Sequence, residues 1–444
     1  MPGFSEIRRQ VVHIAAGACA LLLRWLTWKF AALLALAALV FNGLALPRLG
    51  PALFRPGDRG AVGRSGIVIY PASVLALILC LPHRLDIVAI AWGILAAGDG
   101  CATLVGAHVP SAPLPWNRAK SVGGMIAFVL AGGGAGVALA CWMRPVVPSV
   151  PIWFSLAAPL VAALVAGLVE TTPIGLNDNI SVPAMAALTL WSLSLIEADA
   201  MRAAALLMHD RLPLAIGVNL VFAWAAWRTH AVTRSGAIVG WLIGTTMWLT
   251  TGPRGWTMLA VTFLAAAVTT RMGIRRKILL GIAEARGGRR GPGNAIANTS
   301  LAAWAGLISC GLPDPTLARI ALVAALTTAA SDTVASEIGK AWGRRTWLIT
   351  SMRRVPPGTS GALSLEGTVA GVASAAALAG IGAALGLVPV TTCVAIAMAA
   401  VFAALVESVL GATLEGPGLL NNDALNFVNT GLGAAFALSL WSLR

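Results

Sequence analysis

Apolar stretches of close to twenty residues recur along the chain from Val11 to Leu443, and short polar loops separate them. A helix needs about 20 mostly apolar residues to cross the hydrocarbon core of a bilayer. The pattern therefore predicts an all-α polytopic membrane protein with about fifteen transmembrane helices in two related halves. The predicted spans lie at roughly 11–28, 30–46, 66–82, 87–106, 121–143, 151–170, 182–198, 212–228, 236–251, 255–272, 294–310, 317–338, 364–385, 388–410 and 427–443.

Composition supports this interpretation. The chain is 58% hydrophobic and only 11% charged, and its mean hydropathy is +0.83, which exceeds what a soluble core requires. The net charge of +14 would favour a nucleic-acid partner in a soluble protein, but here the basic residues lie in short loops between spans. That placement fits a membrane topology and attraction for phosphates, so nucleic acid is excluded as a partner. The six cysteines lie in apolar segments and form no C-x-x-C pair, as expected of small buried side chains.

The basic loops also predict the orientation. Cytoplasmic loops of membrane proteins carry an excess of Lys and Arg. With an uncleaved first span and a cytoplasmic N-terminus, four basic loops fall on the cytoplasmic side: 47–65, 107–120, 271–293 and 340–363. We therefore expect a multi-pass protein of the inner or cytoplasmic membrane whose active sites face the cytoplasm, where nucleotides are found.

One motif occurs twice among the apolar helices. Residues 99–106 and residues 332–339 both fit D-x-x-A-x-x-x-G, beginning at Asp99 and Asp332. A carboxylate in or at the end of a membrane span is costly unless it is paired or takes part in chemistry. A solvated helix cap is the ordinary explanation of one such residue, but the repetition in the same local frame favours two related acidic sites.

Three further features follow each motif in the same order. A polar, Gly-rich stretch with a serine opens a helix at 115–124 and again at 356–367. A glutamate comes one span later, and an Asn/Asp cluster follows it at 177–179 and at 421–423. Internal repeats of this kind are common in membrane proteins. The predicted domains are 1–198, a linker with an extra span at 199–235, and 236–444.

These residues have the chemistry of phosphoryl transfer. Gly-rich loops at helix N-termini bind phosphate, and clustered carboxylates hold the Mg²⁺ that bridges nucleotide phosphates. The predicted catalytic residues are Asp99, Glu170, Asp332 and Glu407. The predicted metal ligands are Asp99, Glu170, Asp178, Asp332, Glu337, Glu407 and Asp423. The predicted nucleotide or phosphate ligands are Arg8, Arg9, Asn117, Lys120, Ser121, Arg286, Arg289, Arg290, Arg353, Arg354, Thr359, Ser360 and Ser364, with His13, Asn179, Asn422, Asn426 and Asn429 as further polar site residues. The chain contains no G-x-x-x-x-G-K-[ST], which excludes a P-loop kinase.

The N-terminal half, about 1–198, resembles the phytol kinase and dolichol kinase family of CTP-dependent lipid kinases. The resemblance rests on residues 6–13, 66–71 and 98–102, on Pro115-Trp116-Asn117 with Lys120-Ser121, and on residues 170–183. It implies that this half phosphorylates an isoprenoid alcohol with CTP as the donor.

The C-terminal half, about 233–441, resembles the integral membrane family that includes the plant phytyl-phosphate kinase. This resemblance rests on residues 235–237, 285–291, 331–339, 355–361 and 422–430. Both halves are also distantly similar to CDP-diacylglycerol synthase, which has D-x-x-A-x-x-x-G followed by K-[ST]-x-E-G. The later K-R…K-D stretch of that synthase is absent after Glu170 and after Glu407, and Gly123 stands where the first half would need the glutamate. These departures favour kinase chemistry over cytidylyl transfer.

The leading hypothesis is a bifunctional isoprenoid alcohol salvage kinase. The first half would convert an alcohol of the phytol or geranylgeraniol type to its monophosphate, and the second would form the diphosphate, with Mg²⁺ and a nucleoside triphosphate. The expected partners are the isoprenoid alcohol, the isoprenyl phosphate, the nucleotide and the bilayer. Two alternatives remain open: a cytidylyltransferase-like lipid enzyme with one degenerate half, and a lipid transporter built on the repeat. The clustering of polar residues at one face, away from the midplane, argues against a transporter.

Overall fold

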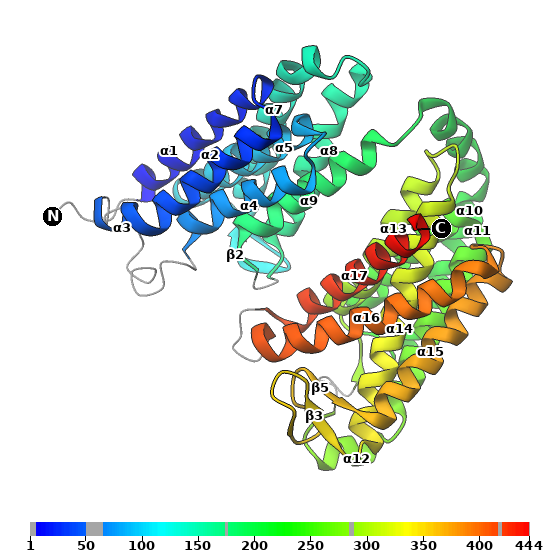
Figure 1. Ribbon diagram of the computed structural model, residues 1–444. Coiled ribbons are helices and arrows are strands. Elements are labelled where there is room, and N and C mark those ends of the chain that lie inside the picture. The colour runs from blue at the N-terminus through cyan, green and yellow to red at the C-terminus, as the bar shows by residue number, and fades with distance from the viewer. Residues whose placement is uncertain (1–5, 50–64, 174–175, 284–287, 416–419, 444) are drawn as a thin grey trace. The chain divides into compact units, whose positions relative to one another are not determined.

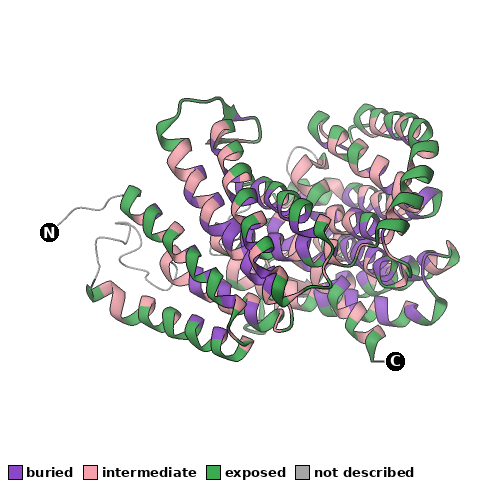
Figure 2. Cartoon of the chain, turned by 90° about the horizontal axis from the view of Figure 1, so that it is seen from above, coloured by how far each residue is buried: buried purple, intermediate pink, exposed green. Residues whose placement is uncertain are grey.

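The computed structural model describes residues 6–49, 65–173, 176–283, 288–415 and 420–443. It divides into two compact units, Met1–Leu195 and Ile196–Arg444 (Figure 1). Each unit has its own core of buried apolar side chains, dominated by Ala, Ile and Leu. Buried and exposed positions alternate along the helices (Figure 2), and many of the exposed residues are large and apolar. Small core residues allow helix backbones to approach closely where no hydrophobic effect drives helices together.

The first unit is a helical bundle with one short hairpin. Its hairpin joins β1 (Pro113–Leu114) antiparallel to β2 (Asn117–Ser121). The helices are α1 (Glu6–Gly17), η1 (Ala18–Arg24), α2 (Trp28–Val40), η2 (Phe41–Ala45), α3 (Leu46–Leu49), α4 (Gly66–Cys80), α5 (Leu85–Gly93), η6 (Ile94–Asp99), α6 (Gly100–His108), α7 (Val122–Met143), η7 (Arg144–Val146), α8 (Ile152–Thr171) and α9 (Asp178–Ser194).

The second unit is a larger helical bundle with a small three-stranded sheet, ordered β4-β3-β5 and antiparallel throughout. The sheet and α12 lie at the same end of this unit in Figure 1. Its elements are α10 (Ala198–Arg228), α11 (Arg234–Arg271), α12 (Ile274–Leu279), α13 (Pro292–Ser309), α14 (Thr316–Trp342), β3 (Thr346–Leu348), β4 (Arg353–Arg354), β5 (Ala362–Ser364), α15 (Leu365–Ala384), η9 (Val390–Thr392), α16 (Cys393–Leu410), η10 (Gly411–Glu415) and α17 (Asn422–Ser442).

The apolar helices confirm an all-α polytopic membrane protein. Within the described residues, nine helical stretches are long and apolar enough to cross a membrane, and Gly66–Cys80 is a shorter apolar helix. The remaining predicted spans also fall on helices, but on ones that are shorter or less apolar: 11–28, 182–198, 236–251, 255–272 and 294–310. The count of about fifteen spans therefore stays a prediction.

Helix α11 consists of two limbs joined at a sharp turn. Gly252 has φ 67° and ψ −162°, a backbone conformation that residues other than glycine rarely adopt, and Pro253 follows it. The two outer ends of α11 approach the same residue, because Gly236 packs on the Arg290 backbone while the Arg290 guanidinium reaches Thr270 at 3.3 Å. The two limbs therefore form an antiparallel hairpin. Two successive membrane spans would run in opposite directions in the same way, as predicted for 236–251 and 255–272.

The repeated motif has the same packing role in both units. Ser121 and Ser364 each end a short strand and cap the next helix, with Oγ accepting the backbone N–H three residues later at 3.2 and 3.1 Å. The alanine and the glycine of D-x-x-A-x-x-x-G pack on the first turn of that capped helix. A Cβ on Gly124 would lie 3.2 Å from the carbonyl oxygen of Ala102, and one on Gly367 would lie 2.5 Å from that of Ala335. The motif thus fixes its aspartate helix against a Ser-capped helix in each unit.

Gly367→Ala should therefore destabilise the second unit by about 1–3 kcal/mol, because its methyl group would displace backbone rather than a flexible side chain. Gly380→Ala is the matched control. Gly380 lies on the same helix with open space beside it, so alanine there should be neutral or stabilising by up to about 1 kcal/mol. Thermal unfolding of both variants in detergent measures the difference, and equal melting temperatures would contradict the close packing.

Candidate active sites in the two units

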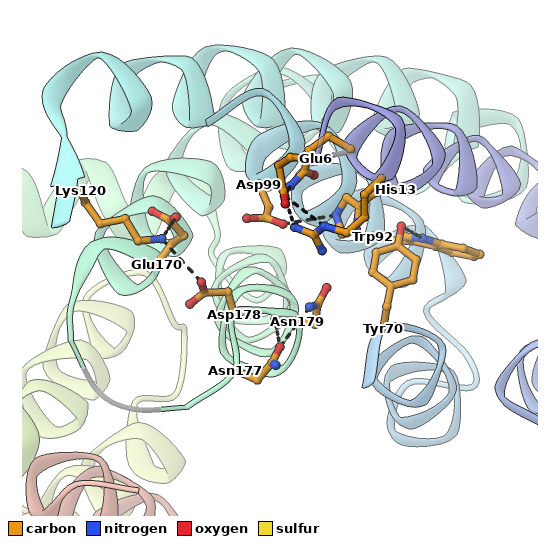
Figure 3. A network of polar contacts seen from close by, with 12 residues as sticks. Glu6, His13, Tyr70, Trp92, Asp99, Lys120, Glu170, Asn177, Asp178 and Asn179 are labelled. Atoms are coloured by element: carbon orange, nitrogen blue, oxygen red, sulfur yellow. Dashed lines mark hydrogen bonds and ion pairs between the residues drawn. The ribbon is translucent and has the colours of Figure 1, made fainter. Parts of the chain in front are cut away.

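Three carboxylates of the first unit meet at one point. Asp99 ends η6, Glu170 lies in the last turn of α8, and Asp178 is the first residue of α9. One oxygen from each lies within 4.8 Å of the others, and Figure 3 shows the three side chains turned toward a common space. Residues far apart in the sequence thus form the oxygen-rich cluster that a divalent cation prefers.

Lys120 on β2 partly balances this negative charge. Its Nζ donates a hydrogen bond to Glu170 Oε1 and lies 3.6 Å from Asp178 Oδ2. Burial lowers the pKa of the Lys120 ammonium, but the carboxylates of Glu170 and Asp178 raise it by more, so the net pKa is above its ordinary value. Lys120 therefore stays charged at neutral pH, beside the carboxylates.

An aromatic group lies on the other side of Asp99. His13 on α1 places Nε2 3.5 Å from Asp99 Oδ2, and its ring packs on Tyr70 with a centroid distance of 4.6 Å (Figure 3). Tyr70 Oη in turn accepts a hydrogen bond of 2.7 Å from Trp92 Nε1. The structure thus brings His13 to the carboxylate cluster. Trp92, which the sequence analysis did not single out, supports that arrangement from a neighbouring helix.

Other predicted residues of the first unit hold the local fold. Asn117 Nδ2 donates to the carbonyl oxygen of Thr171 at 2.9 Å, which ties the hairpin to the end of α8. Arg9 donates to Glu6 Oε1 at 2.6 Å, and Asn179 Nδ2 donates to Asn177 Oδ1 at 3.0 Å. Ser121 caps α7, and Arg8 is exposed on α1. The phosphate role predicted for Ser121 thus competes with its capping bond.

The second unit contains a polar cavity of about 280 Å³. Asp332 from α14 and Glu407 from α16 line it, and their carboxyl groups are close enough to interact electrostatically. Asn429 from α17 donates to Glu407 Oε2 at 2.5 Å, and Ser336, one helical turn after Asp332 on α14, also lines the cavity. Two carboxylates in contact repel each other unless a proton or a cation lies between them. This pair is therefore the second unit's counterpart of the Asp99 cluster.

Glu337 has different partners from those predicted. Lys277 Nζ donates to Glu337 Oε2 at 2.6 Å, and Lys340 Nζ donates to Glu337 Oε1 at 3.1 Å. Lys277 is fully buried and also donates to the backbone carbonyl of Thr270 at 2.7 Å. Both oxygens of Glu337 thus bind lysines, an ion pair that explains how a glutamate can be buried. Glu337 also lines the polar cavity, and its metal role stays a prediction.

The remaining predicted residues of the second unit divide into two groups. Those that line the cavity are Arg290, Thr359, Ser360, Ser364, Asn422 and Asn426. Arg289, Arg353 and Arg354 are exposed and lie outside its lining, as does Asp423, whose carboxylate approaches Gly293. Arg286 lies outside the described residues, as do residues 50–64 of the predicted basic loop 47–65. Of the two neighbouring residues predicted for the site, Asn422 lines the cavity and Asp423 does not.

Sequence reasoning missed several residues that line the cavity or contact its lining. Lys340 follows Glu337 by three positions on one helix, so a helical-spacing signal was present. Asn294 and Thr333 line the cavity from α13 and α14. Thr333 lies within the repeated motif but was not predicted as a site residue, and no local pattern marks Asn294. Lys277 is separated from Glu337 by 60 residues, and only the folded chain brings the two together.

The donor sets in both units suit a hard cation. Magnesium prefers oxygen ligands and usually binds proteins through one or two carboxylates together with substrate phosphates. The first unit offers Asp99, Glu170 and Asp178, and the second offers Asp332 and Glu407 with nearby amide oxygens. The residues present thus fit a magnesium–phosphate complex in each unit.

Comparison with known proteins finds one matching family and several similar membrane proteins. Residues 217–434 match the family described as integral membrane protein DUF92. An uncharacterized membrane protein of Synechocystis sp. is 41% identical over 203 residues, which cover 45% of this chain and 79% of the relative. Protein VTE6, chloroplastic, of Arabidopsis thaliana is 36% identical over 214 residues, or 47% of this chain and 64% of that protein.

A third relative carries an activity in its name. Probable phytol kinase 2, chloroplastic, of Oryza sativa is 30% identical over 194 residues, or 40% of this chain and 63% of that protein. The chain thus covers just under two thirds of the rice and Arabidopsis proteins. No solved structure matches it significantly. From the family match and the extent of the Synechocystis relative that it covers, the chain belongs to the DUF92 family of multi-pass integral membrane proteins.

Proposed function

We propose that this chain is a bifunctional isoprenoid kinase, a fusion of two related lipid kinases. Its first unit phosphorylates an isoprenoid alcohol of the phytol or geranylgeraniol type, and its second unit phosphorylates the resulting monophosphate. One observation carries the proposal: each unit sets an aspartate of D-x-x-A-x-x-x-G near a glutamate from another helix, next to a Ser-capped helix start. The relatives named as probable phytol kinases, from rice and Glycine max, support the reaction class.

In the first unit, Asp99, Glu170 and Asp178 would hold Mg²⁺, which would neutralise charge on the phosphates of the donor. Lys120 lies where it can pair with a donor phosphate, because its ammonium already faces this cluster and stays charged. His13 and Tyr70 form a partly enclosed wall beside Asp99, which keeps the acceptor hydroxyl away from bulk water.

In the second unit, Asp332 and Glu407 would hold the metal, with Asn429 fixing the orientation of Glu407. Arg290 and Lys340 supply positive charge to the same cavity. A monophosphate acceptor already carries nucleophilic oxygen anions, so positioning and charge neutralisation are the main requirements. The absence of a histidine from this cavity's lining, among the described residues, is consistent with that simpler task.

CTP is the proposed donor of the first unit, on the strength of the resemblance. The basic loops support sites that face the cytoplasm from the inner membrane. Purified protein in lipid nanodiscs would be given labelled geranylgeraniol or phytol, with Mg²⁺ and CTP, ATP, GTP or UTP in turn. We expect monophosphate first and diphosphate later, with CTP the best donor for the first step, and no product in EDTA.

Other products would contradict the proposal. A cytidylyl-lipid would indicate the cytidylyltransferase alternative. The absence of any phosphorylated isoprenoid, combined with lipid movement between leaflets, would indicate a transporter.

A further inference from the structure

A second cavity of the same unit is apolar and larger, at about 510 Å³. Side chains from α10, both limbs of α11, α13 and α14 form its walls, among them Phe222, Ile243 and Leu259. Such a cavity within a membrane-embedded bundle is suited to a hydrocarbon chain, because burial of each methylene is favourable in an apolar environment.

The two cavities of this unit share three lining residues: Arg290, Asn294 and Thr333. Arg290 Nη1 donates to Asn294 Oδ1 at 3.0 Å, so the guanidinium is held at this shared rim. One side of the rim faces the carboxylates Asp332 and Glu407, and the other faces the apolar walls. A molecule with an anionic head and a long apolar chain matches this arrangement in charge and in polarity.

This apolar cavity is an elongated groove, and at one end of it lie Asn219 and Trp256, whose polar groups are hydrogen-bonded within the protein. Trp256 Nε1 donates to Asn219 Oδ1 at 2.9 Å, and Asn219 Nδ2 donates to the carbonyl oxygen of Ala215 at 2.9 Å. A ligand therefore needs no polar group at this end of the groove. Between this end and the rim, Gly236, Gly240 and Gly244 line one wall at four-residue intervals. Their positions span about 12 Å of helix, so a five-carbon chain would leave much of the groove unfilled.

We propose that this groove holds the isoprenoid chain of a prenyl monophosphate, with its phosphate at Arg290 and the chain directed toward Trp256. The inference rests on the proposed function of the second unit and deepens it, because it names where the acceptor binds and why its chain length matters. The groove then selects long isoprenoid chains, while Asp332 and Glu407 act on the phosphate.

Gly240 offers a direct test. A Cβ at this position meets no atom within 4 Å, so Gly240→Trp places a large side chain at the groove wall without a clash at its base. We expect KM for geranylgeranyl monophosphate to rise at least about ten-fold, and KM for isopentenyl monophosphate to change less than about two-fold. Gly380→Trp is the matched control, because Gly380 is equally open, lies on α15 and does not line the groove. Equal effects of the two changes, or equal effects on the two acceptors, would overturn the inference.

A binding measurement without nucleotide separates this inference from the proposed reaction. Geranylgeranyl monophosphate with a diazirine at the chain end should label peptides containing Phe222 or Trp256, and Gly240→Trp should abolish that labelling. A phosphatidylcholine with the same diazirine is the comparison for ordinary bilayer lipid. Equal labelling by the phospholipid, or labelling elsewhere, would overturn the inference. If the groove is labelled but wild-type protein makes no diphosphate, the binding site stands and the proposed reaction fails.

Discussion

Asp332→Asn should stop the reaction at the isoprenyl monophosphate. The substitution keeps the size of the side chain but removes the charge that would bind Mg²⁺ beside Glu407. We expect diphosphate formation to fall at least about 100-fold, the scale on which single charge-stabilising groups act in transfer reactions. Monophosphate should accumulate at the wild-type rate, because the first unit has its own carboxylates. The measurement is separation of labelled alcohol, monophosphate and diphosphate over time.

Asp99→Asn should give the reciprocal result. It should abolish use of the alcohol while leaving diphosphate formation from supplied monophosphate intact. Asp199→Asn is the matched control, since Asp199 is an exposed aspartate whose side chain is 94% accessible, and its product pattern should equal that of the wild type. If either active-site change abolishes both steps, the chain has one working site, as the degenerate-half alternative requires.

Glu337→Gln should lower the free energy of unfolding by about 3–5 kcal/mol, because it leaves a buried ammonium without a counter-charge. Lys277 has 0% exposure, and in this variant its partners among the described residues would be neutral: the backbone carbonyls of Thr269 and Thr270 and the amide oxygen of the new glutamine. Lys277→Met should cost less, since Glu337 would keep its bond to the partly exposed Lys340. Thermal unfolding in detergent, followed by tryptophan fluorescence, measures both changes.

The double variant Lys277→Met/Glu337→Gln tests the ion pair itself. Replacing both partners removes the uncompensated charge, so the double variant should be more stable than Glu337→Gln alone. Additive losses would show that the two residues do not stabilise each other. Kinase activity should survive in the double variant at low temperature, because Asp332 and Glu407 are unchanged; its loss would favour Glu337 as a metal ligand.

The fold class followed from the sequence because apolar length alone decides whether a segment can cross a bilayer. The five strands of the described residues did not follow, since they have two to five residues and depend on pairing between loop segments. The turn within α11 was anticipated by the gap between predicted spans, and Gly252 with Pro253 explains it.

Part of each candidate site could also be predicted from the sequence, namely the part marked by a local motif. Asp99 and Asp332 were predicted because their motif occurs twice in the same local frame. The packing of the motif's alanine and glycine on a Ser-capped helix explains why both units keep it. Three other features arise from packing between helices. They are the contact of Lys277 with Glu337, the position of Asn422 in the cavity lining, and the apolar cavity beside Arg290. No local sequence pattern encodes them.

Separate cores in the two units have a consequence for the flow of lipid through the proposed pathway. Each unit buries its own apolar cluster and carries its own carboxylates, yet one chain joins them. Wherever the protein is inserted, the two units are therefore present in equal numbers, and the chain that joins them keeps the local concentration of one near the other high. An isoprenyl monophosphate is a single-chain amphiphile that would disturb a bilayer if it accumulated. If the proposed two steps take place, the ratio of producing to consuming sites is one to one at every level of expression. The level of monophosphate then depends on the relative rates of the two units and not on how much protein is made.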